Sequence, residues 1–436
     1  MKLLFVSLGC DKNLVDSEEM LGLLTGNGFE IVDDETEAEA IVVNTCCFIN
    51  DAKEESVNTI LEMAEYKKTG SCKVLVVTGC MAQRYKNEII EEVPEVDAVL
   101  GTTSYGDILK AIREAMEGKH FQEFKDIDYL PEKLGKRVLT TGGHFGYLKI
   151  AEGCDKHCTY CIIPYARGPV RSLSLEQAVE QTRQLAEEGY REIVLTGIEI
   201  SSWGHDFKNG QSLIDLLEAL PAAAPEVRLR LGSLEPRTVT EDFCRRAAAL
   251  PNLCPQFHLS MQSGCDATLK RMNRKYDTAR YLESVELLNR WFDRPAVTTD
   301  LITGFPEETE EEFAQTLDFI RKCCFAQMHI FPYSIRPGTP AAKMEQVPKA
   351  VKEERARRAA AVAEEMHRSY LEGCVGRTYP VLFEQPKNGK FFGHAPNYME
   401  VLVDGAELHN ALKNVRIIDV DGEALLGEIV EQEAET

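Results

Sequence analysis

The stretch AEGCDKHCTYCIIP, residues 151–164, carries Cys154, Cys158 and Cys161 with three and two residues between them. Iron–sulfur clusters are held by Cys thiolates, usually one per iron, so three thiols leave one iron of a four-iron cluster open. A structural zinc ion instead takes four protein ligands, and no fourth Cys follows at short range, although His157 could complete a Cys3His site. The spacing therefore favours an open iron–sulfur cluster, which can bind a further ligand, over a closed zinc site.

Three apolar, β-branched runs in the first third of the chain each end in a cysteine. The runs are LLFVSLGC, AIVVNTC and VLVVTGC, and they end at Cys10, Cys46 and Cys80. A helical pattern follows each run, over residues 51–64 after the second and 81–93 after the third. Strand, turn and helix in repetition predict a small parallel α/β sheet.

These three cysteines are predicted to lie at one edge of that sheet, because the carboxyl ends of parallel strands meet there. Cysteines placed only for packing could sit anywhere along a buried strand, so three inert strand-end thiols are the weaker alternative. Cys47 could replace Cys46 as a ligand, but its side chain would point to the opposite side of an extended chain. Cys10, Cys46 and Cys80 are therefore predicted to hold a second open cluster.

The remaining cysteines are predicted to be packing residues. Fourteen cysteines in a long chain argue against a disulfide framework and for metal ligation together with buried thiols. Eight of them lack ligand-like spacing and are expected in the core: Cys47, Cys72, Cys244, Cys254, Cys265, Cys323, Cys324 and Cys374.

Length and composition predict several domains. A chain of 436 residues that is 44% hydrophobic is expected to hold two to four domains. The opening MKLLFVSLGCDKN is too short in apolar residues for a signal peptide, and no run approaches the roughly 18 apolar residues of a membrane span. We therefore expect a soluble, cytoplasmic protein with no membrane partner.

The charge is strongly acidic, with a formal net value of −22. Residues 1–137 hold 15 Lys and Arg against 27 Asp and Glu, and residues 377–436 hold 5 against 11, so both ends are acidic. Nucleic-acid binders usually show a basic footprint, whereas an acidic surface suits a basic protein partner. Arg167, Arg171 and the run LKRMNRKY at residues 269–276 could contact phosphates, or could form solvated helix faces.

Strand and helix patterns alternate from Gly143 to about residue 340, which predicts a complete or partial TIM-like parallel barrel. Glycines and carboxylates follow several of these strands, and each alone is common turn or cap chemistry. Together, the glycines could let a cofactor approach the backbone closely, and the carboxylates could accept hydrogen bonds from its ammonium group. The predicted cofactor residues at these strand ends are Gly197, Glu199, Ser233, Glu235 and Gly304. Beyond Gly376, short alternating strands predict a small antiparallel β-barrel.

The two cysteine triplets together resemble those of the radical S-adenosylmethionine (SAM) methylthiotransferases. Tyr160 precedes the last cysteine of CDKHCTYC as in the radical SAM signature, and SLGC, NTC and TGC are similar to the amino-terminal cluster ligands of that family. The carboxyl-terminal β module resembles the TRAM domain. The resemblance implies four segments: an amino-terminal domain at 1–121, a linker at 122–142, a radical SAM core at 143–373 and a TRAM domain at 374–436.

The resemblance also implies an enzyme with two [4Fe–4S] clusters and SAM as cofactors. The cluster of the Cys154 triplet would cleave SAM to a deoxyadenosyl radical, which removes hydrogen from the substrate. The cluster of the Cys10 triplet would carry a sulfur that a second SAM methylates before its transfer. Tyr160 would join the strand-end residues in binding SAM, and flavodoxin or ferredoxin would supply electrons.

The resemblance to subgroups of the family changes along the chain. SLGCDKNLVDSE, NTCCFINDAKEES and residues 143–164 are similar to RimO-type enzymes, which modify an aspartate of ribosomal protein uS12. From about Tyr165, ARGPVRS and HLSMQSGCDATLKRMNRKY are instead similar to MtaB-type enzymes, which act on N6-threonylcarbamoyladenosine beside the tRNA anticodon. Because the barrel and the TRAM module would face the substrate, the prediction from sequence is tRNA, with uS12 as the alternative.

Overall fold

The computed structural model describes residues 1–130, 136–405 and 407–430. Their contacts divide the chain into two compact units of three segments each. The first unit comprises residues 1–140, 151–171 and 334–339, and the second comprises residues 141–150, 172–333 and 340–436. Both cysteine triplets therefore belong to the first unit.

The domain boundaries expected from the sequence stay predictions. The expected linker at 122–142 falls partly on residues 131–135, and the expected TRAM domain falls partly on residues 406 and 431–436. Those positions lie outside the described residues. The two compact units differ from the expected domains, because each unit joins three segments that are distant in sequence.

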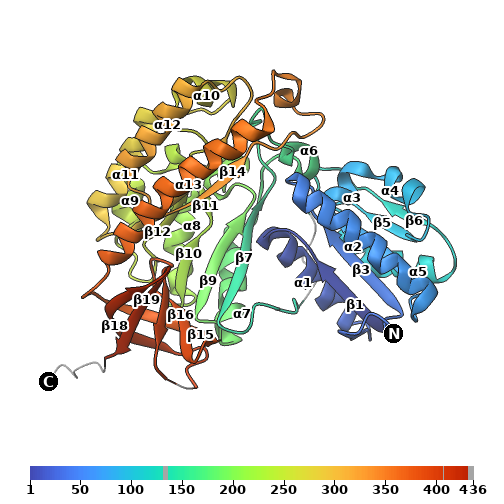
Figure 1. Ribbon diagram of the computed structural model, residues 1–436. Coiled ribbons are helices and arrows are strands. Elements are labelled where there is room, and N and C mark those ends of the chain that lie inside the picture. Colours follow the sequence, from blue (N-terminus) through green and yellow to red (C-terminus); the bar gives the residue numbers. More distant parts are fainter. Residues whose placement is uncertain (131–135, 406, 431–436) are drawn as a thin grey trace. The chain divides into compact units, whose positions relative to one another are not determined.

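A six-stranded parallel sheet forms the first unit, as predicted, and its strand order is β2-β1-β3-β4-β5-β6 (Figure 1). Its strands are β1 (Lys2–Ser7), β2 (Glu30–Ile31), β3 (Ala40–Thr45), β4 (Val74–Gly79), β5 (Ala98–Leu100) and β6 (Phe121–Glu123). Its helices are α1 (Asp11–Thr25), α2 (Asn50–Thr69), α3 (Cys80–Tyr85), α4 (Asn87–Glu92), α5 (Ile108–Met116) and α6 (Ile163–Arg167), with the 3-10 turn η1 (Tyr105–Asp107).

Both faces of this sheet are covered by helices, which explains why its strands are apolar throughout. Ile41 and Val43 of β3 pack with α2, α3 and α4, whereas their neighbours Ala40 and Val42 pack with α1 and α5. Successive side chains of a strand point to opposite faces. Continuous burial of β3 and β4 therefore fixes the register that sets where each strand ends.

The helix expected over residues 81–93 is interrupted. The chain forms α3 and then α4, and Lys86 between them has a φ of 41°. A left-handed residue with a side chain cannot continue a right-handed helix. The apolar periodicity spans the break because both short helices pack on the same face of the sheet.

The predicted partial barrel is present as two four-stranded sheets, β10-β9-β7-β8 and β11-β12-β13-β14. Its strands belong to the second unit, except for the end of β7 and the first residue of β8. The strands are β7 (Phe145–Glu152), β8 (Arg171–Ser172), β9 (Glu192–Gly197), β10 (Arg228–Leu231), β11 (Ser233–Leu234), β12 (Gln256–Leu259), β13 (Ala296–Thr303) and β14 (Gln327–Pro332). Strands β11 to β14 pair in parallel, as do β9 and β10. Only Gly232 separates β10 from β11, so the two sheets follow one another directly.

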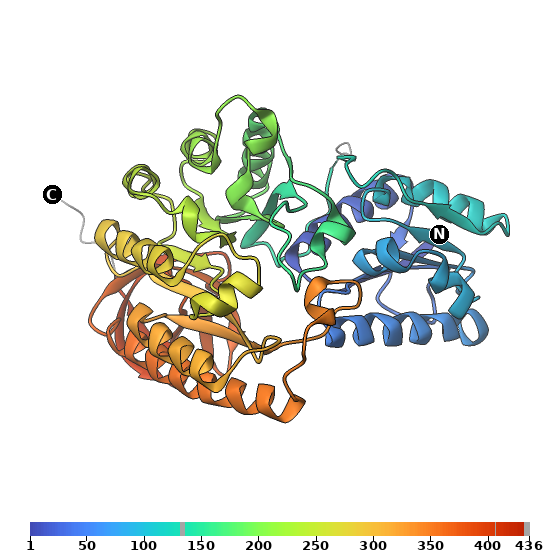
Figure 2. The same cartoon turned by 90° about the horizontal axis from the view of Figure 1, so that it is seen from above.

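Helices lie outside these strands (Figure 2). They are α7 (Leu175–Glu187), α8 (Leu213–Ala219), α9 (Glu241–Ala247), α10 (Asp266–Arg271), α11 (Thr278–Trp291), α12 (Glu310–Cys323) and α13 (Lys349–Glu372), with 3-10 turns η2 (Ile200–Ser202), η3 (His205–Phe207), η4 (Leu220–Ala222), η5 (Pro236–Thr238) and η6 (Pro340–Lys343). Ser174 and Thr309 begin α7 and α12 with capping boxes, in which side chain and backbone satisfy each other's donors. No helix in the described residues is long and apolar enough to cross a membrane.

A closed five-stranded barrel ends the second unit, in the order β15-β16-β17-β19-β18. Its strands are β15 (Thr378–Lys387), β16 (Lys390–His394), β17 (Glu400–Val403), β18 (Leu412–Asp421) and β19 (Ala424–Ile429). All pairs are antiparallel except β17 with β19, which is parallel. The small barrel predicted from the sequence is therefore present, with one parallel pair closing it.

Buried arginines of β10 hold this barrel within its unit. Arg228 donates to the carbonyl oxygen of Pro380 at 2.9 Å, and Arg230 donates to that of Pro396 at 3.0 Å. The buried Glu192 carboxylate accepts from Arg230 at 2.7 and 3.0 Å. Burial opposes ionisation of Glu192, but the two arginines lower its pKa to about 2.

Candidate functional site

The three cysteines that follow β1, β3 and β4 gather at one edge of the sheet, as parallel strands require. Cys10 precedes α1, Cys46 follows β3, and Cys80 begins α3. Gly9 has a φ of 91°, and a Cβ there would lie 2.7 Å from Cβ of Cys46 and 3.0 Å from its Sγ. Glycine at this position lets the segment leading into Cys10 lie against the side chain of Cys46.

Asn13 connects the ends of these strands. Its Nδ2 donates to the carbonyl oxygens of Leu8 at 3.0 Å and Thr45 at 2.9 Å. Its Oδ1 accepts from the thiol of Cys80 at 3.8 Å and from Arg167. A fully buried amide therefore ties all three cysteine-bearing segments together.

Ser56 of α2 fixes the backbone of Cys46. Its hydroxyl accepts from the amide of Cys46 at 3.0 Å and donates to the carbonyl oxygen of Cys46 at 2.9 Å. Cys47 instead belongs to the apolar cluster between the sheet and α2. Of the two adjacent cysteines, Cys46 is the one whose side chain lies against Gly9, as the alternation of an extended chain requires.

Burial sets the protonation of these thiols. It raises the pKa of Cys46 and raises that of Cys80 to about 12, where Arg167 opposes the rise. The neighbouring Cys10 raises both pKa values further, because thiolates at the same edge would repel one another. A metal ligand must be a thiolate, so metal binding at this edge displaces protons.

The Cys154 triplet lies in a loop that leaves the end of β7 and returns through α6. The amide of Cys154 donates to the carbonyl oxygen of Gly168 at 2.9 Å, which closes the neck of the loop. Gly153 has a φ of 71°, and a Cβ there would lie 1.8 Å from the carbonyl oxygen of Pro169. Within the loop, Cys161 donates its amide to the carbonyl oxygen of Cys158 at 3.0 Å.

Arg336 connects the loops that carry the two triplets. Its Nη1 donates to the carbonyl oxygen of Tyr160 at 2.8 Å, and its Nε donates to that of Phe48. The guanidinium also lies 4.7 Å from the centre of the Phe48 ring. Tyr160, the residue predicted to assist SAM binding, is buried. Its backbone is held by Arg336 of segment 334–339.

No three His, Cys, Asp or Glu side chains in the described parts of the chain are placed to hold a single metal ion. Iron–sulfur clusters are held by Cys thiolates. The donor chemistry of both triplets, three Cys each, thus fits open iron–sulfur clusters.

Four of the predicted cofactor residues lie at neighbouring strand ends in the second unit. Gly197 ends β9 and Glu199 precedes η2, while Ser233 begins β11 and Glu235 precedes η5. The hydroxyl of Ser201 accepts from the amide of Glu235 at 2.8 Å, which joins the two strand ends. Glu199 accepts from Ser202, and Glu235 accepts from Arg237 at 2.7 Å.

Gly304 follows β13 and has a close environment of its own. Its amide donates to Glu308 at 2.8 Å, and a Cβ at this position would lie 2.5 Å from Cγ of Lys352. Burial raises the pKa of Glu308 to about 7, although Arg355 opposes the rise. The role of Gly304 in binding SAM stays a prediction.

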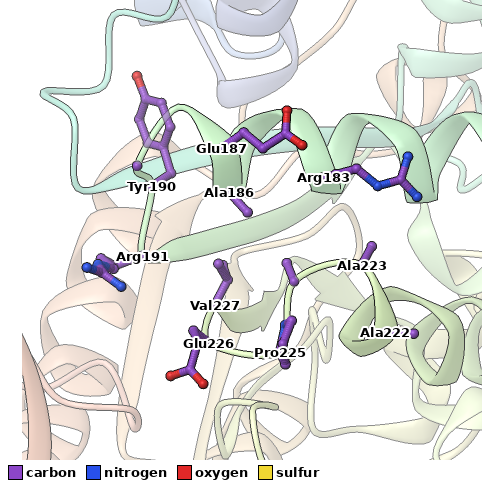
Figure 3. Close-up of a pocket in the computed structure, with 12 residues that line it drawn as sticks. Arg183, Ala186, Glu187, Tyr190, Arg191, Ala222, Ala223, Pro225, Glu226 and Val227 are labelled. Atoms are coloured by element: carbon purple, nitrogen blue, oxygen red, sulfur yellow. The ribbon is translucent and has the colours of Figure 1, made fainter.

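The pocket in Figure 3, of about 510 Å³, lies away from these strand ends. Tyr190, Arg191 and Val227 line it, where α7 ends and where β9 and β10 begin. Active sites of parallel barrels lie at the carboxyl ends of the strands, whereas residues at the opposite end contribute to stability. This pocket is therefore not the candidate active site.

The basic residues considered for phosphate contacts are built into the fold. Arg167 and Arg171 are buried. Arg271 forms an ion pair with Glu312, and Arg274 donates to the carbonyl oxygen of Ser260 at 3.0 Å. The guanidinium groups of these arginines bond to acceptors of the protein, whereas Lys270 and Lys275 of the same run are exposed.

Seven of the eight cysteines expected in the core are buried, and Cys324 is the exception. Cys324 follows α12 with a φ of 52° and is exposed. The left-handed residue that ends the helix turns its side chain outward. Asn13 is the important residue that the sequence pattern did not indicate, because its partners lie on three separate strand ends.

Comparisons with known proteins agree with this arrangement. Residues 2–101 match the model of the uncharacterized protein family UPF0004, and residues 148–320 match that of the radical SAM superfamily. A ribosomal protein uS12 methylthiotransferase RimO from Lachnoclostridium phytofermentans is 46% identical over 404 residues, 91% of this chain and 92% of that protein. The chain belongs to the radical SAM methylthiotransferase family. A RimO from Acetivibrio thermocellus is 36% identical, with 98% of both chains covered.

Solved structures support the fold of this radical SAM methylthiotransferase. The radical SAM methyltransferase TsrM from Kitasatospora setae has a TM-score of 0.58 at 15% identity, with 78% of this chain and 77% of that chain covered. The cobalamin-dependent radical enzyme OxsB has a TM-score of 0.52 at 14% identity, with 84% and 56% covered. The methylthiotransferase is thus an enzyme of the radical SAM class, which uses an iron–sulfur cluster and SAM.

The prediction of a tRNA substrate is wrong. Relatives between 36% and 46% identical are named ribosomal protein uS12 methylthiotransferases. Their similarity covers up to 99% of the methylthiotransferase, well beyond Tyr165, where the local resemblance to tRNA-modifying enzymes begins. Motifs such as LKRMNRKY build the barrel in this chain, so their likeness to another subgroup does not identify the substrate.

Proposed function

We propose that this methylthiotransferase adds a methylthio group to a C–H bond of an aspartate in ribosomal protein uS12. The observation that carries the proposal is the 46% identity to a uS12 methylthiotransferase over nine-tenths of both chains. The acidic net charge of −22 agrees with a basic protein substrate.

The cysteines would hold two [4Fe–4S] clusters, one in each triplet. Cys154, Cys158 and Cys161 would hold the cluster of the radical SAM domain, in a loop whose neck is closed by backbone contacts. Cys10, Cys46 and Cys80 would hold the second cluster, at an edge that Asn13 and Ser56 keep in register. When bound, such clusters supply one-electron reduction of SAM and a site for the sulfur to be transferred.

The chain's own residues would position the cofactor. Glu199 and Glu235 would accept hydrogen bonds from its ammonium and ribose hydroxyl groups, and Gly197 would allow close approach of the backbone. Ser233 and Gly304 would line the same cofactor, and Tyr160 would assist from the cysteine loop. Flavodoxin or ferredoxin would supply the electrons.

Mass spectrometry of cells that lack this chain tests the substrate. The methylthio group of the uS12 aspartate should disappear and should return when the wild-type gene is restored. A gene encoding Cys46→Ala should not restore it, because the second cluster would lose a ligand. Loss of methylthiolated nucleosides from tRNA, with uS12 unchanged, would contradict the proposal.

A further inference from the structure

Among the described residues of the first unit, Arg167 is the most deeply buried cation, with 1% of its surface exposed. It is the last residue of α6, the short helix that begins two residues after Cys161. Ala166 beside it packs in the apolar cluster under the sheet, and the carbonyl oxygen of Ala166 accepts from Thr102 at 2.8 Å. The helix that follows the Cys154 triplet is thereby anchored among the strands that carry Cys10, Cys46 and Cys80.

The guanidinium of Arg167 spreads its donors over both triplets' surroundings. Its Nε donates to Sγ of Cys80 at 3.3 Å. Its Nη1 donates to Asp16 at 2.8 Å and to Glu152 at 3.1 Å, and its Nη2 donates to Asn13. Glu152 is the last residue of β7, directly before the loop of the Cys154 triplet.

Two carboxylates and a second cation lie close to this guanidinium. Asp16 and Glu152 are buried carboxylates, and Arg167 and Arg171 are buried cations. Arg171 donates to the carbonyl oxygens of Arg167 at 3.0 Å and Pro169 at 2.8 Å. Only Arg167 of this pair has a hydrogen bond to a cysteine sulfur among the described residues. A thiolate at Cys80 would thus add negative charge directly opposite a fixed donor.

We propose that Arg167 is a positioning residue that sets the reduction potential of the cluster held by Cys10, Cys46 and Cys80. Hydrogen bonds to cluster sulfur stabilise the more negative, reduced form and raise the potential. Because the same side chain also holds Glu152, the potential of this cluster depends on the segment that carries the Cys154 triplet. This inference rests on the proposed second cluster.

Redox titration followed by electron paramagnetic resonance tests the inference. The background is the triple variant C154A/C158A/C161A, reconstituted without oxygen with iron and sulfide and reduced stepwise with dithionite. In this background R167Q should move the midpoint potential to a more negative value. R167K should move the midpoint potential less, because the positive charge stays while the hydrogen bond to Sγ of Cys80 is lost. If R167Q does not fold, R167K alone tests the role of Arg167.

Arg171→Gln is the matched control, because it removes a buried cation of the same network without touching a thiol. Its midpoint should move less than that of R167Q. An equal shift, or no shift in R167Q and R167K when iron is retained, would overturn the role of Arg167. Failure of the triple variant itself to bind iron would instead overturn the proposed second cluster.

Discussion

The two cysteine triplets of this methylthiotransferase are built in opposite ways. Cys154, Cys158 and Cys161 come from one loop, and their spacing is local to eight residues. Cys10, Cys46 and Cys80 come from three strand ends, so their spacing depends on the register of the whole sheet. A local site can be disturbed by its own loop alone, whereas a tertiary site can be disturbed from any element that holds the sheet.

Removing one ligand from each triplet should give the largest contrast. Cys158→Ala should abolish cleavage of SAM, because the cluster that binds it would be lost. Cys46→Ala should retain SAM cleavage within about threefold while methylthiolation of uS12 falls by at least about 100-fold, since the proposed function divides the cofactor chemistry between two clusters. Deoxyadenosine and modified peptide can be measured in the same reaction. An equal fall of both products in Cys46→Ala would contradict the division of chemistry between the clusters.

Gly153→Ala should disturb only the local triplet. A Cβ at this residue would lie 1.8 Å from the carbonyl oxygen of Pro169, so the neck of the loop must open. We expect SAM cleavage to fall about tenfold or more, in line with a backbone strain of about 2 kcal/mol. Gly210→Ala is a matched control, because Gly210 has a similar φ of 87° but open space around it. An equal loss of SAM cleavage in both variants would show that the strain of a positive φ, and not the opening of the loop neck, causes the effect.

Ser56→Ala should disturb only the tertiary triplet, and more mildly. It removes both hydrogen bonds to the backbone of Cys46, at a cost of about 1–3 kcal/mol. The chain that keeps only the amino-terminal triplet should bind iron more weakly when Ser56 is replaced. In a chain that keeps only the Cys154 triplet, Ser56→Ala should leave iron binding unchanged. Weaker iron binding in that chain would contradict the idea that Ser56 supports the amino-terminal triplet alone.

The smallest effect is expected from acid, and it should begin outside both triplets. Burial opposes ionisation of Glu384, but hydrogen bonds from His144 and His394 lower its pKa to about 2 from an ordinary 4.5. A lowered pKa stabilises the folded state above pH 4.5, and that contribution is lost as the pH falls from 4.5 towards 2. Denaturant unfolding of wild type and Glu384→Gln should therefore converge in this range, and parallel curves would contradict the role of Glu384.

Sequence patterns predicted the elements of the fold better than the contacts within the site. β-branched runs ending in cysteine indicate parallel strands that share an edge, because strand direction alone brings those ends together. The contacts of Arg167 with Asn13 and Asp16 could not be predicted, since 154 and 151 residues separate the partners. The break at Lys86 was also hidden, because a single left-handed residue leaves apolar periodicity intact.

The substrate shows a different limit of sequence patterns. A basic run such as residues 269–276 reads the same whether its arginines face phosphates or protein acceptors. Arg271 faces Glu312, and Arg274 faces the carbonyl oxygen of Ser260. Similarity over the whole chain was needed to favour the ribosomal protein over tRNA.

The first unit is assembled from residues 1–140, 151–171 and 334–339, so the chain enters and leaves it repeatedly. Splitting the gene at any point before residue 339 would therefore separate pieces of this unit, and neither product would contain it intact. Exchange of gene segments between relatives meets the same constraint. We expect a crossover near Tyr165 to preserve this unit when the incoming segment brings an arginine at 167, because that side chain donates to Asn13, Asp16 and Cys80.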